Sequence, residues 1–341
     1  MGVQPTSTGC TPTFQVLAGT TDVRVNDFYR WPLVRLFERI EGQLAAHIVE
    51  HELQAGLFRV PIPNVDRRAL REAVVNALAH RDHARAGTVM VRWTNEAVTM
   101  SSPGSFVDGV SPSNLLTVEP RPRNPTLADA FKRIGLTERT GRGVDLIYEG
   151  MLRFGRPAPS FASSDTHAVV VELPRGEPDI AFVRLVLEQE RRLGTPLPIT
   201  NLILLDLLRR QRRIDVGEAA QAIQRDAAAA RAILEQLVEA GLVHAHGVKK
   251  WRTYTLSAAV YRTLGQKAAW VRQAGFSRLH QEQMIRSLVK QKGTVRRRDV
   301  IDLCKLGPGQ ATRLLSALVE KGVLRRNGAR NGTVYEPGDN L

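Results

Sequence analysis

The C-terminal half of the chain contains two stretches of similar sequence, and this repeat constrains the fold more than any other feature. The stretches span 199–257 and 281–337, and they contain the matching segments LVEAGLV (237–243) and LVEKGVL (318–324). Each stretch predicts an apolar helix, a short basic break, a second helix, a turn, a third helix that ends at a glycine, and a hairpin with a basic tip. This order is typical of a winged helix-turn-helix, in which the third helix enters the major groove and the wing contacts phosphates.

Positive charge is concentrated in the same half of the chain. The 341 residues include 48 Lys and Arg against 34 Asp and Glu, a net charge of +14. Residues 1–175 hold 20 basic and 18 acidic side chains, whereas residues 176–341 hold 28 and 16. A local excess of this kind is expected of a surface that binds a polyanion, and the absence of a basic amphipathic anchor or lipidation motif favours nucleic acid over membrane.

We therefore predict double-stranded DNA as the partner of both repeats. The alternative interpretations are a solvated basic surface without a partner, and three-helix units that serve packing or dimerisation. The candidate DNA contacts are Arg225, Arg231, Lys249, Lys250 and Arg252 in the first repeat, and Arg296, Arg297, Arg298, Arg313, Arg325, Arg326 and Arg330 in the second.

Cysteine content and hydropathy predict a reducing compartment and exclude several classes of protein. Cys10 and Cys304 lie far apart and outside any CxxC or Cys/His cluster, which argues against a disulfide framework, a zinc site or an iron–sulfur cluster. No stretch approaches the ~20 apolar residues of a membrane span, and the N-terminus lacks the pattern of a secretory signal. We expect a cytoplasmic protein associated with the nucleoid.

The N-terminal half predicts a mixture of strands and helices. The expected elements are a strand over 13–19, a long amphipathic helix over 33–57, a helix over 66–82 capped by Asp66, a hairpin over 88–93 and 97–102, and a strand over 167–174. Residues 103–143 are rich in Pro, Gly, Arg and Asn and carry few packing signals, which is typical of a lid or binding loop.

The helix over 66–82 places Glu72, Asn76 and His80 four residues apart and therefore on one face. A carboxylate and an amide one turn apart can divide phosphoryl chemistry, because the carboxylate orients a water and the amide oxygen binds magnesium. An amphipathic helix often shows this spacing by chance. Two glycine turns strengthen the case: SSPGSFVDG follows the hairpin, and TERTGRGVDLIYEGM places a Gly-x-Gly at a helix start, where backbone N–H groups can approach phosphates.

This order of motifs resembles the Bergerat or GHKL ATP-binding fold of gyrase, Hsp90, MutL and histidine kinases. The segments EAVVNALAHRD, SSPGSF and PRNPTLADAFKRIGLTERTGRGVDLI, with a terminal PxPxF, are more closely similar to the divergent GHKL-type domain of predicted regulators labelled RecG-like or Schlafen-AlbA-linked. The resemblance covers 12 to about 174, and the two winged helices also suit that family. The usual AlbA domain is missing apart from a remnant strand at 13–19, which indicates a shortened member or a fragment.

The resemblance implies a role for each matching residue, with ATP and magnesium as cofactors. It makes Glu72 the general base, Asn76 the magnesium ligand through the nucleotide, Gly141 and Gly143 the phosphate-binding turn, Gly104 a neighbour of the adenine, and Arg123 and Asn124 parts of the lid. One position departs from the family, because GHKL proteins usually place an Asp before the glycine turn and this chain has Ser102. A serine can still accept a hydrogen bond from the adenine amino group, but it carries no charge.

The predicted fold class is α+β, with a GHKL-like α/β sandwich around a mixed sheet followed by two winged helix-turn-helix domains. The predicted division is a tail with a remnant strand at 1–19, the ATP-binding domain at 20–175, and winged helices at 176–265 and 266–341. No GxxxxGK[ST] occurs, so a P-loop helicase is excluded.

Three functional hypotheses follow from these predictions. The leading one is a DNA-binding, homodimeric transcriptional regulator in which ATP and magnesium modulate DNA binding or dimerisation. The second is a slow DNA-associated ATPase in repair or phage defence. The third is a degenerate scaffold that binds no nucleotide and dimerises the winged helices.

Overall fold

The computed structural model describes residues 13–18, 22–29, 31–55, 58–137, 141–247, 252–265, 281–304, 306–328 and 333–341. The chain forms two compact units, Met1–Asp206 with Ile223–Arg225, and Leu207–Ala222 with Asp226–Leu341. Both contain helices and strands, which confirms the predicted α+β class. No helix of the described ranges is both long and apolar enough to cross a bilayer. Cys10, Lys249, Lys250 and Arg330 lie outside the described residues.

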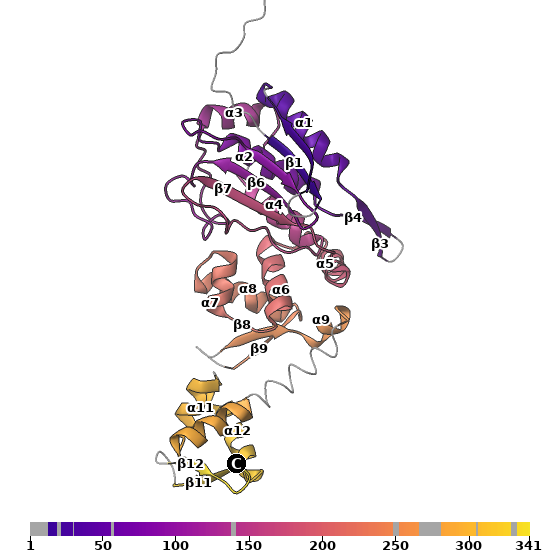
Figure 1. Cartoon of the computed structure of the whole chain (residues 1–341). Coiled ribbons are helices and arrows are strands. Elements are labelled where there is room, and N and C mark those ends of the chain that lie inside the picture. The colour runs from indigo at the N-terminus through magenta and orange to yellow at the C-terminus, as the bar shows by residue number, and fades with distance from the viewer. Residues whose placement is uncertain are drawn as a thin grey trace, which may run out of the picture. The chain divides into compact units, whose positions relative to one another are not determined.

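The N-terminal unit is built around a five-stranded sheet (Figure 1). Its elements are β1 (Thr13–Ala18), β2 (Asp22–Phe28), α1 (Leu33–Ala46), β3 (Glu50–Ala55), β4 (Phe58–Pro63), α2 (Arg67–Ala79), β5 (Met90–Trp93), β6 (Ala97–Pro103), α3 (Pro125–Arg133), α4 (Gly143–Arg153), β7 (Ala168–Pro174) and α5 (Ile180–Leu193). The strand order is β2-β1-β5-β6-β7. β1 runs parallel to β5 and every other neighbouring pair is antiparallel, so the sheet is mixed, as predicted.

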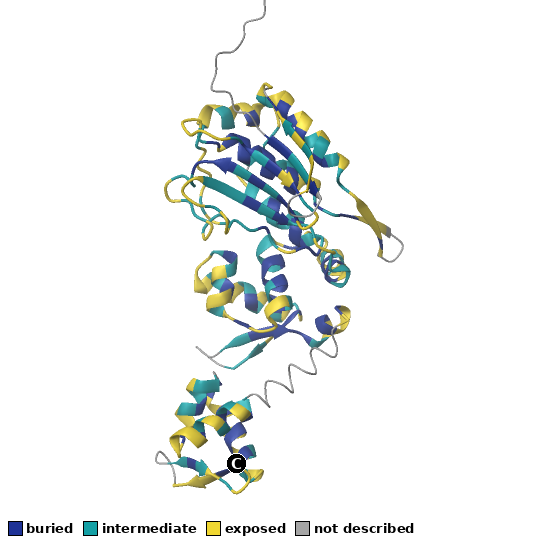
Figure 2. Ribbon diagram, in the orientation of Figure 1, coloured by how far each residue is buried: buried dark blue, intermediate teal, exposed yellow. Residues whose placement is uncertain are grey.

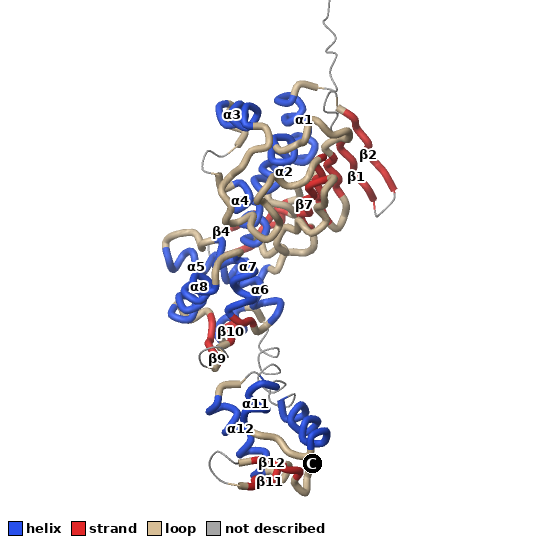
Figure 3. The backbone as a smooth tube through the Cα atoms, turned by 90° about the vertical axis from the view of Figure 1, so that its left-hand side faces the viewer, coloured by secondary structure: helices blue, strands red, loops and turns tan. Residues whose placement is uncertain are grey.

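Helices α1, α2 and α4 lie on one side of this sheet (Figure 3) and share its apolar core. α2 is the central helix, and most of its residues are buried (Figure 2). A helix that is buried over most of its surface needs neighbours on several faces. As predicted, Asp66 caps α2, because its side chain accepts a hydrogen bond from the Ala69 N–H at 2.8 Å.

The predicted helix over 33–57 is wrong beyond Ala46, because residues 50–55 form β3, which pairs with β4 in a separate hairpin. The Asn64 side chain explains where the helix ends. Its Nδ2 donates to His47 O at 3.0 Å, and its Oδ1 accepts from Val49 N–H at 3.1 Å. These bonds satisfy backbone groups that a longer helix would have paired internally.

Two further elements differ from the sequence predictions. The strand predicted over 13–19 as a remnant of a missing domain is β1, which lies in the central sheet between β2 and β5. The long loop of 103–143 contains the helix α3, which anchors itself through the buried Phe131. The hairpin of β5 and β6 and the strand β7 agree with the predictions to within two residues.

The C-terminal half contains two groups of three helices followed by two strands. The first comprises α6 (Ile199–Gln211), β8 (Ile214–Asp215), α7 (Val216–Ile223), α8 (Ala227–Glu239), β9 (Val243–His246), β10 (Thr253–Leu256) and the short α9 (Ala258–Thr263). The second comprises helical residues 281–292, α11 (Arg297–Cys304), α12 (Pro308–Glu320), β11 (Leu324–Asn327) and β12 (Val334–Pro337). In both groups the last two strands pair antiparallel.

Candidate nucleotide-binding site

A cavity of ≈ 310 Å³ opens beside α2 in the N-terminal unit. Its wall is built from α2, the ends of β6 and β7, the loop that precedes α3, and the start of α4. The volume lies at the lower end of the range for small-molecule sites. Six of the eight residues predicted for the nucleotide site line it: Glu72, Asn76, Ser102, Arg123, Gly141 and Gly143.

Glu72 and Asn76 reach the cavity because they occupy one face of α2, one turn apart. Glu72 is only 7% exposed and is held against the start of α4. A Cβ added at Gly143 would overlap Glu72 Oε1, so only glycine leaves room for this carboxylate. The helix face therefore presents one carboxylate and one amide to the same cavity wall.

The Gly-x-Gly motif supplies the adjoining part of the wall. Gly141 has φ +72°, a conformation that other residues rarely adopt, and α4 begins at Gly143. The N-terminal end of a helix carries unpaired N–H groups and a positive dipole, which together favour an anion. Asp145 also lines the cavity in the first turn of α4, and burial raises the pKa of its carboxyl.

Ser102, which the sequence predicts to lie near the adenine, is 4% exposed. Its hydroxyl donates a hydrogen bond to Ala77 O on α2 at 2.7 Å. Because its single proton is already used, the oxygen can only accept a hydrogen bond from a bound molecule. The site therefore keeps an acceptor at this position without a negative charge.

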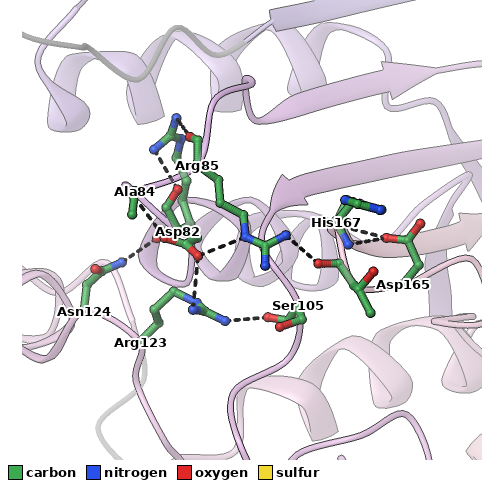
Figure 4. A network of polar contacts seen from close by, with 11 residues as sticks. Asp82, Ala84, Arg85, Ser105, Arg123, Asn124, Asp165 and His167 are labelled. Carbon is green, nitrogen blue, oxygen red and sulfur yellow. Dashed lines mark hydrogen bonds and ion pairs between the residues drawn. The ribbon is translucent and has the colours of Figure 1, made fainter.

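Arg123 links the loop before α3 to the end of α2 (Figure 4). Its guanidinium donates to Ser105 O at 2.6 Å and approaches Asp82 Oδ2 at 3.5 Å. Arg85 approaches the same Asp82 oxygen at 3.4 Å. Asp82 thus faces two arginines, and only one of them, Arg123, also lines the cavity.

Asn124 and Gly104 do not line the cavity and instead support its frame. Asn124 Nδ2 donates to Ala79 O at 2.9 Å and to Arg81 O at 2.8 Å, which satisfies carbonyl groups at the C-terminal end of α2. Gly104 has φ +110°, and a Cβ there would lie 2.7 Å from that of Asp82. Gly104 therefore packs the start of the 103–143 segment against Asp82, and Asn124 holds the middle of this segment against the end of α2.

The structure adds cavity residues that the motif analysis missed. Arg121 and Lys132 bring positive charge to the wall, and Lys132 was missed because it lies on α3, which the Pro-rich sequence did not predict. Thr137 Oγ1 is buried without a hydrogen-bond partner among the described residues. His80 also lines the cavity, and burial together with the nearby Arg123 guanidinium lowers its pKa.

All the described candidate DNA contacts except Arg252 are exposed, and two of the exposed ones also lie near acidic side chains: Arg298 is 4.0 Å from Asp302 and Arg325 is 3.0 Å from Asp339. Arg252 approaches Glu235 at 2.6 Å, and its guanidinium lies 5.7 Å from the ring centroid of Tyr254. The exposed candidates are Arg225, Arg231, Arg296, Arg297, Arg298, Arg313, Arg325 and Arg326. Lys249, Lys250 and Arg330 fall outside the described ranges, so their role stays a prediction.

Comparison with known proteins shows that part of the cavity wall belongs to a segment similar to an ATPase-like domain. Residues 87–173 match a family model described as "Putative ATP-dependent DNA helicase recG C-terminal". No curated protein matches the chain. The matched segment includes β6, β7 and the Gly-x-Gly turn, whereas Glu72 and Asn76 on α2 precede it.

A solved structure shares the fold over nearly the whole chain. The DIP2311 protein from Corynebacterium diphtheriae superimposes with a TM-score of 0.65 at 22% identity, over 97% of this chain and 59% of that one. Similarity at this identity establishes the fold alone, and this chain spans little more than half of that protein. The N-terminal unit thus contains an ATPase-like domain related to that of RecG.

Proposed function

We propose that this chain is a DNA-binding regulator whose N-terminal unit binds ATP with magnesium and whose C-terminal repeats are winged helix-turn-helix units that bind double-stranded DNA as a homodimer. Nucleotide binding changes the affinity for DNA. The proposal also relates the chain to the RecG-like, Schlafen-linked regulators that its motifs resemble. The convergence of Glu72, Asn76 and the glycines of the Gly-x-Gly turn on one cavity carries it.

The residues of the cavity fit a magnesium nucleotide. Asn76 offers the oxygen ligand that magnesium prefers, and the ion normally completes its shell with water and phosphate oxygens. Among the described residues no group of three His, Cys, Asp or Glu could hold a metal by itself, so magnesium would enter with the nucleotide. Arg121, Arg123 and Lys132 would neutralise phosphate charge, and the start of α4 would donate N–H groups to it.

Helix α4 supports the proposed coupling because it connects the cavity to the segment that leads into the repeats. Its first residues line the cavity, and at its other end Arg153 pairs with Glu190 of α5 at 2.7 Å. Glu190 also accepts a hydrogen bond from Leu197 N–H at 3.1 Å, just before α6. Immediately after α4, Gly155 O accepts a bond from Asp179 N–H, at the start of α5. A shift of α4 would therefore act on α5 directly.

Calorimetric titration with ATP and magnesium tests the binding step, with Asn76→Ala as the variant and Asn95→Ala, in the exposed β5–β6 turn, as the matched control. We expect the first variant to lose binding and the control to retain it. DNA affinity is then measured across a salt series with and without the nucleotide. An Asn76→Ala protein that matched the wild type in both assays would refute the proposal, and nucleotide-independent DNA binding would favour the scaffold hypothesis.

A slow ATPase is the second candidate function. The observation that favours it is the Glu72 carboxylate, which is buried in the cavity wall and placed one turn from Asn76. In that case Glu72 orients the attacking water as general base. Glu72→Gln should then abolish phosphate release while nucleotide binding persists, and turnover no greater than background in the wild type would refute it.

A further inference from the structure

The two C-terminal repeats align without a gap, which allows them to be compared position by position. Residues 237–243 correspond to 318–324, a spacing of 81 residues. The structure keeps the same spacing elsewhere, because Ile214 pairs with Tyr254 in the first repeat and Val295 pairs with Tyr335 in the second.

The start of the second helix is built in the same way in both repeats. The backbone N–H of Asp215 donates to Glu218 Oε2 at 2.8 Å, and the N–H of Arg296 donates to Asp299 Oδ2 at 2.7 Å. The two repeats therefore have equivalent backbones at this point. Side chains at matching positions can then be compared directly, and where they differ, the two surfaces differ in chemistry.

At five positions, an exposed arginine of the second repeat corresponds to a residue of the first repeat that is neither Lys nor Arg. The exposed Arg296, Arg297 and Arg298 correspond to Asp215, Val216 and Gly217, and the exposed Arg325 and Arg326 of the wing correspond to His244 and Ala245. Arg325 pairs with Asp339, but both side chains are more than half exposed, so this pairing is weak.

The third helices differ in the position of their exposed arginine. α12 exposes Thr312, Arg313 and Ser316, whereas the corresponding residues of α8 are Arg231, Ala232 and Glu235. Arg313 Nε donates to Gly309 O at 3.3 Å, which directs its guanidinium toward the helix start, the part of a recognition helix that contacts base edges.

Apart from the exposed Arg231, the first eight residues of α8 carry no side chain that can hydrogen-bond to a base. The helix begins with four alanines, 227–230, and its Glu235 already accepts hydrogen bonds from Arg252 and Tyr254. The excess of basic over acidic side chains is also larger in the second repeat. Residues 266–341 contain 15 basic and 6 acidic side chains, whereas residues 176–265 contain 13 and 10.

We propose that the two repeats have different roles: the second inserts α12 into the major groove and reads the sequence through Arg313, while the first contacts only phosphates. The inference rests on the proposed DNA binding and adds which repeat determines specificity. An arginine can pair with both acceptors of a guanine edge, whereas an alanine at the same position cannot pair with any base. Arg296, Arg297 and Arg298 would supply phosphate contacts beside α12.

The test uses the full chain and a duplex that the wild type selects from a random pool. Fluorescence anisotropy gives the affinity of Arg313→Ala and of Arg231→Ala, a matched removal of one exposed arginine from each third helix. We expect Arg313→Ala to lose about tenfold or more in affinity and to lose preference at one base pair. Arg231→Ala should weaken the selected duplex and an unrelated duplex equally, by less than about threefold.

The salt dependence provides a second measurement. Replacing Arg296, Arg297 and Arg298 by alanine should reduce the slope of log affinity against log salt by about 2 to 3, because each phosphate contact contributes about 0.9. An Arg231→Ala protein that lost sequence preference, or an Arg313→Ala protein that kept it, would overturn the assignment while leaving DNA binding intact. A wild type that bound no DNA would overturn the proposed function and this inference together.

Discussion

Gly143→Ala tests whether the contact between α2 and α4 sets the geometry of the cavity. The added methyl group would overlap Glu72 Oε1 and lie 2.9 Å from Glu72 Cδ. The carboxylate must therefore move by more than ~1 Å, and a displacement of that size can reduce a catalytic rate by about 100-fold. The backbone itself tolerates the change, because φ at this position is not positive.

The expected cost in stability is small, which separates this effect from unfolding. Alanine improves on glycine in a helix by up to about 1 kcal/mol, and the overlap involves the far end of a flexible side chain. We expect the free energy of unfolding to change by less than about 1 kcal/mol. ATP affinity should fall about tenfold, because the displaced carboxylate lines the cavity that receives the phosphates, and any hydrolysis should fall by about 100-fold.

Gly42→Ala in α1 is the matched control. No atom lies within 4 Å of a Cβ added there, so this variant gains the same helix propensity without touching the cavity. Titration calorimetry and a phosphate-release assay measure both proteins, and urea unfolding measures their stability. If Gly143→Ala bound and turned over ATP as Gly42→Ala does, the assignment of Glu72 to the nucleotide site would be wrong.

Three further predictions concern stability and coupling. Arg156→Met should lower the free energy of unfolding in urea by about 1 to 3 kcal/mol, because Arg156 is 2% exposed and the variant leaves the carbonyls of Pro63, Arg175 and Gly176 without its guanidinium as donor. A loss below about 1 kcal/mol would contradict that role. Arg153→Gln should retain ATP and DNA binding but abolish the effect of ATP on DNA affinity, since the bond to Glu190 is lost; unchanged coupling would count against α4 as the connection. The lowered pKa of His80 means that the unfolded chain binds its proton more tightly, so this residue should reduce stability as pH falls below about 6.5. Unfolding titrations should show a shallower acid decline for His80→Asn, and identical profiles would refute this contribution.

Elements set by local sequence could be predicted well. α2 follows from its Asp66 cap and its apolar pattern, and the β5–β6 hairpin follows from two strand-like runs around a short turn. The motif residues of α2 and the Gly-x-Gly turn were predicted on local evidence and a resemblance. Their convergence on one cavity required the fold, because about 70 residues separate Glu72 from Gly143.

Elements decided by distant contacts could not be predicted in the same way. The segment EHELQA at 50–55 continues an apolar pattern compatible with a helix, but pairing with β4 and the Asn64 side chain end α1 at Ala46. Lys132 lines the cavity because α3 forms within a segment that the sequence predicts to be a loop.

The sequence by itself determined the fold class, the two repeats and the asymmetry of charge, because these depend on periodicity, similarity and composition. The tertiary structure decided which polar residues share a cavity and which act as supports: Asn124 bonds to the end of α2 and does not line the cavity, whereas Ser102 lines the cavity while its hydroxyl donates to Ala77 O. The physical reason is that a polar side chain bonds to whichever partner the fold brings within about 3 Å, and sequence spacing does not specify that partner.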